Sequence, residues 1–89
     1  MAYFTVTYDL MAQKNYKRVI DELVRLGGAR VALSVWLVER IETNAFGLRD
    51  HLLGYIDADD KLVVIEFEKC PAYTRALPEG AAWVTARFG

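Results

Sequence analysis

The chain has 89 residues, a formal net charge of −1 and a single cysteine. This length predicts one domain with one small core. The balanced charge excludes a uniformly basic nucleic-acid-binding or membrane-surface protein, and a lone cysteine excludes both an intramolecular disulfide and a multi-cysteine zinc site. Because no apolar run or signal-peptide pattern is present, we expect a cytoplasmic domain over residues 1–89, with a core in residues 2–69 and a tail over residues 70–89.

Composition also indicates an oligomer. Hydrophobic residues make up 54% of the chain, a high share for so short a protein. A domain of this size buries only about 60 to 65% of its unfolded surface. We therefore expect a homodimer that covers further apolar surface.

The segment over residues 4–10 alternates apolar and polar side chains. Its apolar positions are Phe4, Val6, Tyr8 and Leu10, and its polar positions are Thr5, Thr7 and Asp9. Side chains on a strand alternate between faces, so the pattern predicts a strand with the apolar set directed inward. Asp9 then closes the polar face, either as a strand-terminating or capping residue or as a ligand for a metal.

Residues 16–26 follow a helical rhythm, with Tyr16, Ile20, Leu23 and Val24 on the predicted apolar face. The Gly27-Gly28 pair ends this helix. From residue 29 to 41 the chain is rich in β-branched and aromatic residues, which predicts either two strands joined by a tight turn near Ser34 or one long bent strand.

The second half begins with a capping segment at residues 42–44 and a predicted helix over residues 45–56. An acidic turn leads to a strand over residues 61–69, whose first half is apolar on both faces, as in a covered central strand. In the tail, a helix starting at Pro78 and an edge strand over residues 82–88 are both compatible with the pattern. Either element would dock Trp83 and Phe88 onto the domain or onto a partner.

The element order is strand, helix, strand, strand, helix, strand, which predicts an α+β, ferredoxin-like βαββαβ fold with a short C-terminal element. Right-handed crossovers place both helices on one face of a four-stranded antiparallel sheet. The other face is then open. Thr5, Thr7 and Asp9 would lie on this open face, where a second subunit or a ligand could meet them.

Three short segments carry a family resemblance: the strand ending in Tyr8-Asp9, the Gly27-Gly28 turn followed by Arg30, and the step Ser34-Val35-Trp36. The chain resembles the small CRISPR-associated protein of the spacer-adaptation complex, a ferredoxin-like dimer with toxin relatives such as virulence-associated protein D. The resemblance covers the first half of the chain, and the second half in element order. It departs from the family pattern at Ala32, where relatives often carry a polar residue, and in the tail, which does not match their added strand.

The resemblance implies a dimer in which Asp9 from each subunit faces its counterpart and binds a divalent metal. Mg²⁺ keeps several waters and is satisfied by one or two carboxylates with substrate phosphate, so a doubled Asp9 meets the minimum for a metal-dependent endonuclease acting on RNA or DNA. The non-catalytic alternatives are a protein-binding regulator or inhibitor and a nucleotide-binding dimer. Expected nucleic-acid contacts are Lys14, Lys17, Arg18 and Arg30, and the alternative for the residues of the first helix is an ordinary face of mixed charge, because Asp21 and Glu22 lie among them. Expected dimer-interface residues are Tyr8, Ser34 and Trp36, and the alternatives for Trp36 are a core position or a platform for a base.

We interpret the other residues with titratable or nucleophilic side chains as structural. The acidic residues Asp57, Asp59 and Asp60 lack the glycine and distant glutamate of a calcium loop, so we interpret them as a solvated turn. His51 is expected to be a surface or partly buried histidine, with general-base catalysis as the alternative. Ser34 and Cys70 lack the sequence setting of a nucleophile.

Overall fold

The computed structural model describes residues 2–9 and 16–89. The elements in chain order are β1 (Ala2–Asp9), α1 (Lys17–Arg25), β2 (Ala29–Ala32), β3 (Val35–Arg40), α2 (Ala45–Leu52), the 3₁₀ turn η1 (Leu53–Tyr55), β4 (Lys61–Phe67) and α3 (Pro78–Phe88). The predicted ferredoxin-like order is therefore confirmed, and the ambiguous C-terminal element is a helix with Pro78 at its first turn.

The four strands form one antiparallel sheet in the order β2-β3-β1-β4. β1 is central, with Thr5 opposite Leu37 of β3 on one side and opposite Ile65 of β4 on the other. The prediction of a covered central strand in the segment after residue 60 is wrong, because β4 lies at an edge of the sheet. Its apolar side chains Val63 and Ile65 are 49% and 55% exposed.

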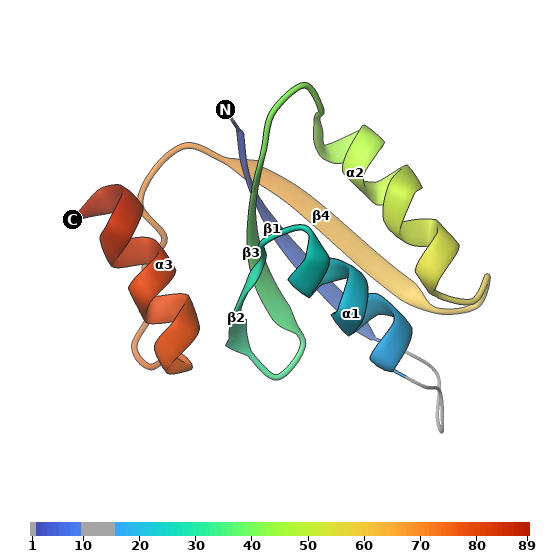
Figure 1. Cartoon of the computed structure of the whole chain (residues 1–89), viewed down its shortest axis with the longest axis horizontal. Coiled ribbons are helices and arrows are strands. Elements are labelled where there is room, and N and C mark those ends of the chain that lie inside the picture. Colours follow the sequence, from blue (N-terminus) through green and yellow to red (C-terminus); the bar gives the residue numbers. More distant parts are fainter. Residues whose placement is uncertain (1, 10–15) are drawn as a thin grey trace.

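Helices α1 and α2 cover one face of the sheet, the inner face, as predicted (Figure 1). Of the predicted inward set, Phe4 and Val6 are fully buried and Tyr8 is 4% exposed, and all three pack in the core with residues of both helices; Leu10 lies outside the described residues. The residues that complete this core are Val19, Leu23, Leu26, Trp36, Val38, Leu48, Leu52 and Ile56.

The buried face of α1 matches the predicted one only in part, because Leu23 and Ile20 pack on the core but Tyr16 and Val24 do not. Val19 and Leu23 are fully buried, whereas Tyr16 is 40% exposed and Val24 is 60% exposed. Both sets of residues satisfy helical spacing, so periodicity alone cannot separate them. The tertiary packing selects the row that runs from Val19 through Leu23 to Leu26.

The connections after α1 agree with the turn chemistry of the sequence. Gly27 has a positive φ of 79°, a conformation that glycine adopts without a Cβ penalty, and it ends the helix. Of the two alternatives for residues 29–41, the structure has two strands, β2 and β3, which are joined by a turn at Leu33 and Ser34. Asn44 caps α2 by accepting a hydrogen bond from the Gly47 backbone N–H at 2.8 Å.

We call the face of the sheet that is turned away from α1 and α2 the outer face. Helix α3 packs on this face against β2 and β3, so these two strands separate α3 from α1 (Figure 1). Trp83 is 6% exposed, and its ring meets the Tyr3 ring edge-on at a centroid distance of 5.6 Å. The approach to β2 is so close that a Cβ on Gly80 would lie 2.7 Å from Val31 Cα. The backbone N–H of Leu77 also donates to the Val31 carbonyl at 2.8 Å.

The expectation of a wholly open outer face therefore needs correction. Helix α3 covers its β2–β3 side, because Trp83 and Val84 pack with Ala29 and Leu37. The β1–β4 side retains exposed apolar positions at Val63 and Ile65. None of the helices in the described part of the chain is long and apolar enough to cross a membrane.

Candidate nucleic-acid site

Asp9 ends the central strand and is exposed. Its partner in the β4 register is Lys61. The two residues line a shallow hollow of about 180 Å³ together with Thr7, Tyr8 and Val63. Within residues 2–9 and 16–89, no hydrogen bond or ion pair engages the Asp9 carboxylate. The carboxylate is thus available at the margin of the uncovered outer face.

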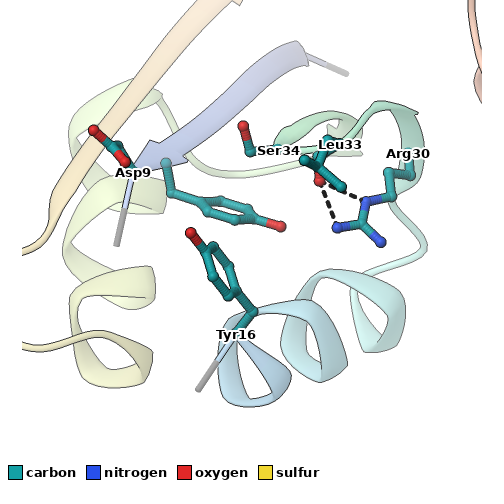
Figure 2. A pocket seen from close by; sticks show the side chains of 6 residues that line it. Asp9, Tyr16, Arg30, Leu33 and Ser34 are labelled. Carbon is teal, nitrogen blue, oxygen red and sulfur yellow. Dashed lines mark hydrogen bonds between the residues drawn. The ribbon is translucent and has the colours of Figure 1, made fainter. Parts of the chain in front are cut away.

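A larger pocket of about 410 Å³ opens on the other side of the strand end. We call it the tyrosine pocket, and its lining residues are Tyr8, Asp9, Tyr16, Arg30, Leu33 and Ser34. Tyr8 lines this pocket beside Tyr16, with 5.7 Å between the two ring centres, and Figure 2 shows the Asp9 carboxylate directed away from the Tyr16 ring. This divergence follows from strand alternation, because consecutive side chains of β1 leave opposite faces of the sheet.

Arg30 is held at the rim of the pocket by the β2–β3 turn. Its Nε and Nη2 atoms donate to the Leu33 carbonyl at 2.8 and 2.5 Å (Figure 2). Its guanidinium carbon also lies 5.5 Å from the centre of the Trp36 ring, within the range of a cation–π contact. These contacts use one edge of the guanidinium, and no other described residue hydrogen-bonds to the edge formed by Nη1 and Nη2, which can donate to a ligand.

Tyr8 and Trp36 belong to the core of the subunit. Trp36 is 2% exposed, and its Nε1–H donates to the Tyr8 hydroxyl oxygen at 3.1 Å. Trp36 pairs with Val6 in the sheet register, on the face that α1 and α2 cover. This position differs from the interface role expected for these two side chains, which would require surface that they do not have. Ser34, the third expected interface residue, is partly exposed in the turn beside Arg30.

The basic residues expected to contact nucleic acid are dispersed. Lys14 lies outside the described residues. Lys17 forms an ion pair with Asp21 in the next turn of α1, and the Arg18 Nη2 donates to the Gly54 carbonyl at 2.8 Å, which ties α1 to η1. Of the expected basic residues that the structure describes, Arg30 lines the tyrosine pocket.

A buried carboxylate between the helices, that of Glu22 with Arg25 and His51 around it, was not predicted. Glu22 of α1 is 4% exposed and receives two hydrogen bonds of 2.6 Å from Arg25. His51 of α2 lies 2.5 Å from the same carboxylate through its Nε2. The bidentate Arg25 contact lowers the pKa of Glu22 to about 2 against the opposing effect of burial, and His51 adds a smaller lowering. Glu22 and Arg25 have the i,i+3 spacing of a helix ion pair, but no sequence signal identifies the contact of Glu22 with His51.

The acidic turn before β4 holds Asp57, Asp59 and Asp60, whose carboxylate oxygens all lie within 4.8 Å of one another. The Asp57 backbone N–H donates to the Asp60 carboxylate at 2.8 Å, and the Asp60 N–H donates to the Asp57 carbonyl at 3.1 Å. Among the described residues, these three side chains are close enough together to hold a cation. Two of the three are exposed, in keeping with a turn that faces solvent.

The fold and the exposed strand-end carboxylate define a ferredoxin-like α+β protein with an open acidic position beside its central strand. The family model of CRISPR associated protein Cas2 matches residues 1–72, and the chain therefore belongs to this family. Membership makes it a CRISPR-adaptation-type protein and confirms the resemblance seen in its first half. No solved structure matched the chain. Helix α3 lies beyond the matched residues.

Proposed function

We propose that the chain is a dimeric nucleic-acid-binding subunit of CRISPR spacer adaptation, in which Asp9 from both subunits holds Mg²⁺ for phosphodiester hydrolysis. The observation that carries the proposal is the position of Asp9. Its carboxylate is exposed at the end of the central strand and engages no other described residue. Family membership supports a role in CRISPR adaptation.

The uncovered half of the outer face supplies a surface for the second subunit. Val63 and Ile65 of β4 are about half exposed, and Thr5 and Thr7 of β1 lie beside them in the sheet register. Most homodimers are two-fold symmetric, so the same patch would meet its own copy. Burial of this apolar surface would stabilise the dimer, and Asp9 lies at the end of the same patch.

The donor set fits magnesium only when two subunits contribute. Mg²⁺ prefers oxygen ligands and commonly takes one or two carboxylates, with water and phosphate oxygens completing the octahedron. One subunit offers Asp9 alone, because the group of three clustered acidic residues found in the described part does not include it. When bound, the metal would polarise the scissile phosphate and activate water. Asp9 would position the ion, and Lys61 beside it would offset the charge of the phosphate.

A second candidate is a purely architectural subunit that binds nucleic acid without cleaving it. The observation that favours it is Lys61, the direct cross-strand neighbour of Asp9. A lysine in this position competes with a cation for the carboxylate, since opposite charges on facing strands attract.

Cleavage assays separate these two functions. Purified chain is incubated with Mg²⁺ and labelled single-stranded RNA, single-stranded DNA or duplex DNA, with EDTA as the blank. We expect cleavage that Asp9→Asn abolishes, whereas Asp50→Asn, a control at an exposed carboxylate on α2, leaves it unchanged. Equal cleavage by Asp9→Asn and the parent chain would exclude the metal site. Nucleic-acid binding without cleavage by any variant would establish the architectural function.

A further inference from the structure

The tyrosine pocket presents hydrogen-bond donors that the metal site does not use. We infer that it binds one unpaired guanine base of a nucleic-acid strand, an inference that rests on the proposed nucleic-acid binding. Ligand pockets commonly measure about 300 to 1,000 Å³, and the volume of about 410 Å³ lies in this range. The exposed side chain of Leu33, at 82%, lies at the mouth.

The first donor is the free edge of Arg30. Because Nε and one Nη2 proton are engaged by the Leu33 carbonyl, the guanidinium is fixed in plane and in direction before a ligand arrives. The remaining Nη1 and Nη2 protons form a two-pronged donor. Such a fork recognises pairs of acceptors in one plane, and a rigid donor loses less conformational entropy on binding than a free arginine.

The second donor is the Tyr8 hydroxyl. Its oxygen accepts the Trp36 Nε1–H at 3.1 Å, so its own proton must point elsewhere. Within the described part of the chain this proton has no acceptor, although Tyr8 is only 4% exposed. The Tyr8 hydroxyl and the Arg30 guanidinium are both neighbours of the Trp36 ring, the first through the 3.1 Å hydrogen bond and the second at 5.5 Å from the ring centre, and both residues line the tyrosine pocket. Two donors of different origin are therefore brought to one pocket.

The third element is an aromatic surface. Tyr16 is 40% exposed, and its ring lies 5.7 Å from the Tyr8 ring with a 47° tilt, which leaves no space for a base between them. A base can instead stack on the free face of Tyr16. Stacking on aromatic side chains is the usual way in which proteins hold unpaired bases, whereas a base within a duplex cannot enter a closed pocket.

Guanine matches this donor arrangement better than the other bases do. Its O6 and N7 atoms are two coplanar acceptors, and arginine bidentate to this edge is the commonest base-specific contact in protein–DNA complexes. Adenine places an amino donor where guanine has O6, so it would direct a donor at the donors of Arg30 and Tyr8. On the corresponding edge cytosine presents an amino donor, and thymine and uracil present the single carbonyl O4 in place of two acceptors. An unpaired cytosine also has two adjacent acceptors, N3 and O2, but on its Watson–Crick edge, so the preference is for the O6/N7 edge of guanine over the corresponding edge of the other bases.

The test is NMR titration in EDTA, so that it is independent of cleavage. The probes are thymidine pentanucleotides with guanine, adenine or 7-deazaguanine at the centre, because the last base lacks the N7 acceptor. The two indole N–H signals report on different sites: Trp36 lies beneath Arg30, whereas Trp83 belongs to α3 and packs against the outer face. We expect the guanine probe to shift the Trp36 signal, leave the Trp83 signal unchanged and bind about 10-fold more tightly than the other two.

Variants separate recognition from general charge attraction. Arg30→Lys keeps the positive charge but lacks the two-pronged donor, so the 10-fold preference for guanine should disappear. Arg49→Lys, the same change on the exposed surface of α2, should retain it. Equal binding of the three probes by the parent chain would overturn the guanine assignment while leaving the proposed nucleic-acid binding intact. A Trp36 shift produced equally by inorganic phosphate would also overturn it, because the donors would then recognise the strand backbone.

Discussion

The docking of α3 can be tested with a single methyl group. In Gly80→Ala the new Cβ would lie 2.7 Å from Val31 Cα and 2.8 Å from the Arg30 carbonyl oxygen. Both atoms belong to the backbone of β2, so neither can rotate away, and α3 must move to relieve the overlap. Substituting Ala for Gly would otherwise favour the helix by up to about 1 kcal/mol.

The magnitude follows from the difference between these two effects. Overpacking a tight contact costs about 1 to 3 kcal/mol, and the gain in helix propensity offsets part of it. We expect Gly80→Ala to lower the free energy of unfolding by about 1 to 2 kcal/mol, which corresponds to a fall in Tm of roughly 5 to 15 °C for a domain of this length.

Urea titration and thermal melting, followed by tryptophan fluorescence, provide the measurement. Gly54→Ala is the matched control, because nothing lies within 4 Å of the added Cβ there, and it should leave stability unchanged or slightly raised. Trimming Val31 to alanine should not rescue Gly80→Ala, since the closest contacts are main-chain atoms. A Gly80→Ala protein as stable as the parent chain would refute the close packing of α3 on β2.

Two further predictions concern buried polar groups. Because the pKa of Glu22 is lowered to about 2, its ionised form should stabilise the fold above about pH 4.5, and this contribution should be lost as the pH falls toward 2. Urea titrations at pH 7 should therefore show Glu22→Gln to be less stable than the parent chain by about 1 to 2 kcal/mol, a value reduced because Arg25 and His51 are exposed. The difference in stability should shrink as the pH is lowered to 2. A difference that does not depend on pH would contradict the ionised Glu22 contact. Tyr8→Phe removes the acceptor of the buried Trp36 Nε1–H and should cost about 1 to 3 kcal/mol, measured by the same titration, whereas a neutral effect would mean that the indole finds another partner.

The fold followed from the sequence where local patterns have one interpretation. Strand alternation over Phe4, Val6 and Tyr8 correctly predicted the buried face of β1, and Gly27 correctly marked the end of α1. The inner-face helices and the antiparallel sheet then followed from element order. These features are readable from local patterns, namely strand alternation, turn residues and the order of the elements, even though the sheet itself joins distant residues.

The errors arose where tertiary contacts decide between equal patterns. Val24 and Val19 both satisfy helical spacing, yet only Val19 is buried. The apolar run in β4 resembled a covered strand, but Val63 and Ile65 face solvent at a sheet edge, where a partner subunit is expected under the proposed function. Docking of Trp83 onto the domain was one of the predicted alternatives, but the strands that α3 contacts lie far from it in the sequence, so no local pattern could specify them.

The candidate site was predicted in part. Tyr8, Asp9, Arg30 and Ser34 were selected from short motifs, and the structure brings all four to the lining of one pocket. Lys61 was missed as a site residue, and Trp36 was expected at the dimer interface. Lys61 becomes a neighbour of Asp9 only through the β1–β4 register, and Trp36 supports Tyr8 and Arg30 from within the core.

The paired Asp9 site is the central claim of the proposed function. A crystal structure of the protein grown with Mn²⁺ in place of Mg²⁺ would test it directly, because anomalous scattering locates each manganese ion. We predict a two-fold symmetric dimer with one ion bound between the Asp9 carboxylates of its two subunits. A dimer with its two Asp9 residues far apart, or manganese bound only at the Asp57, Asp59 and Asp60 turn, would contradict the claim.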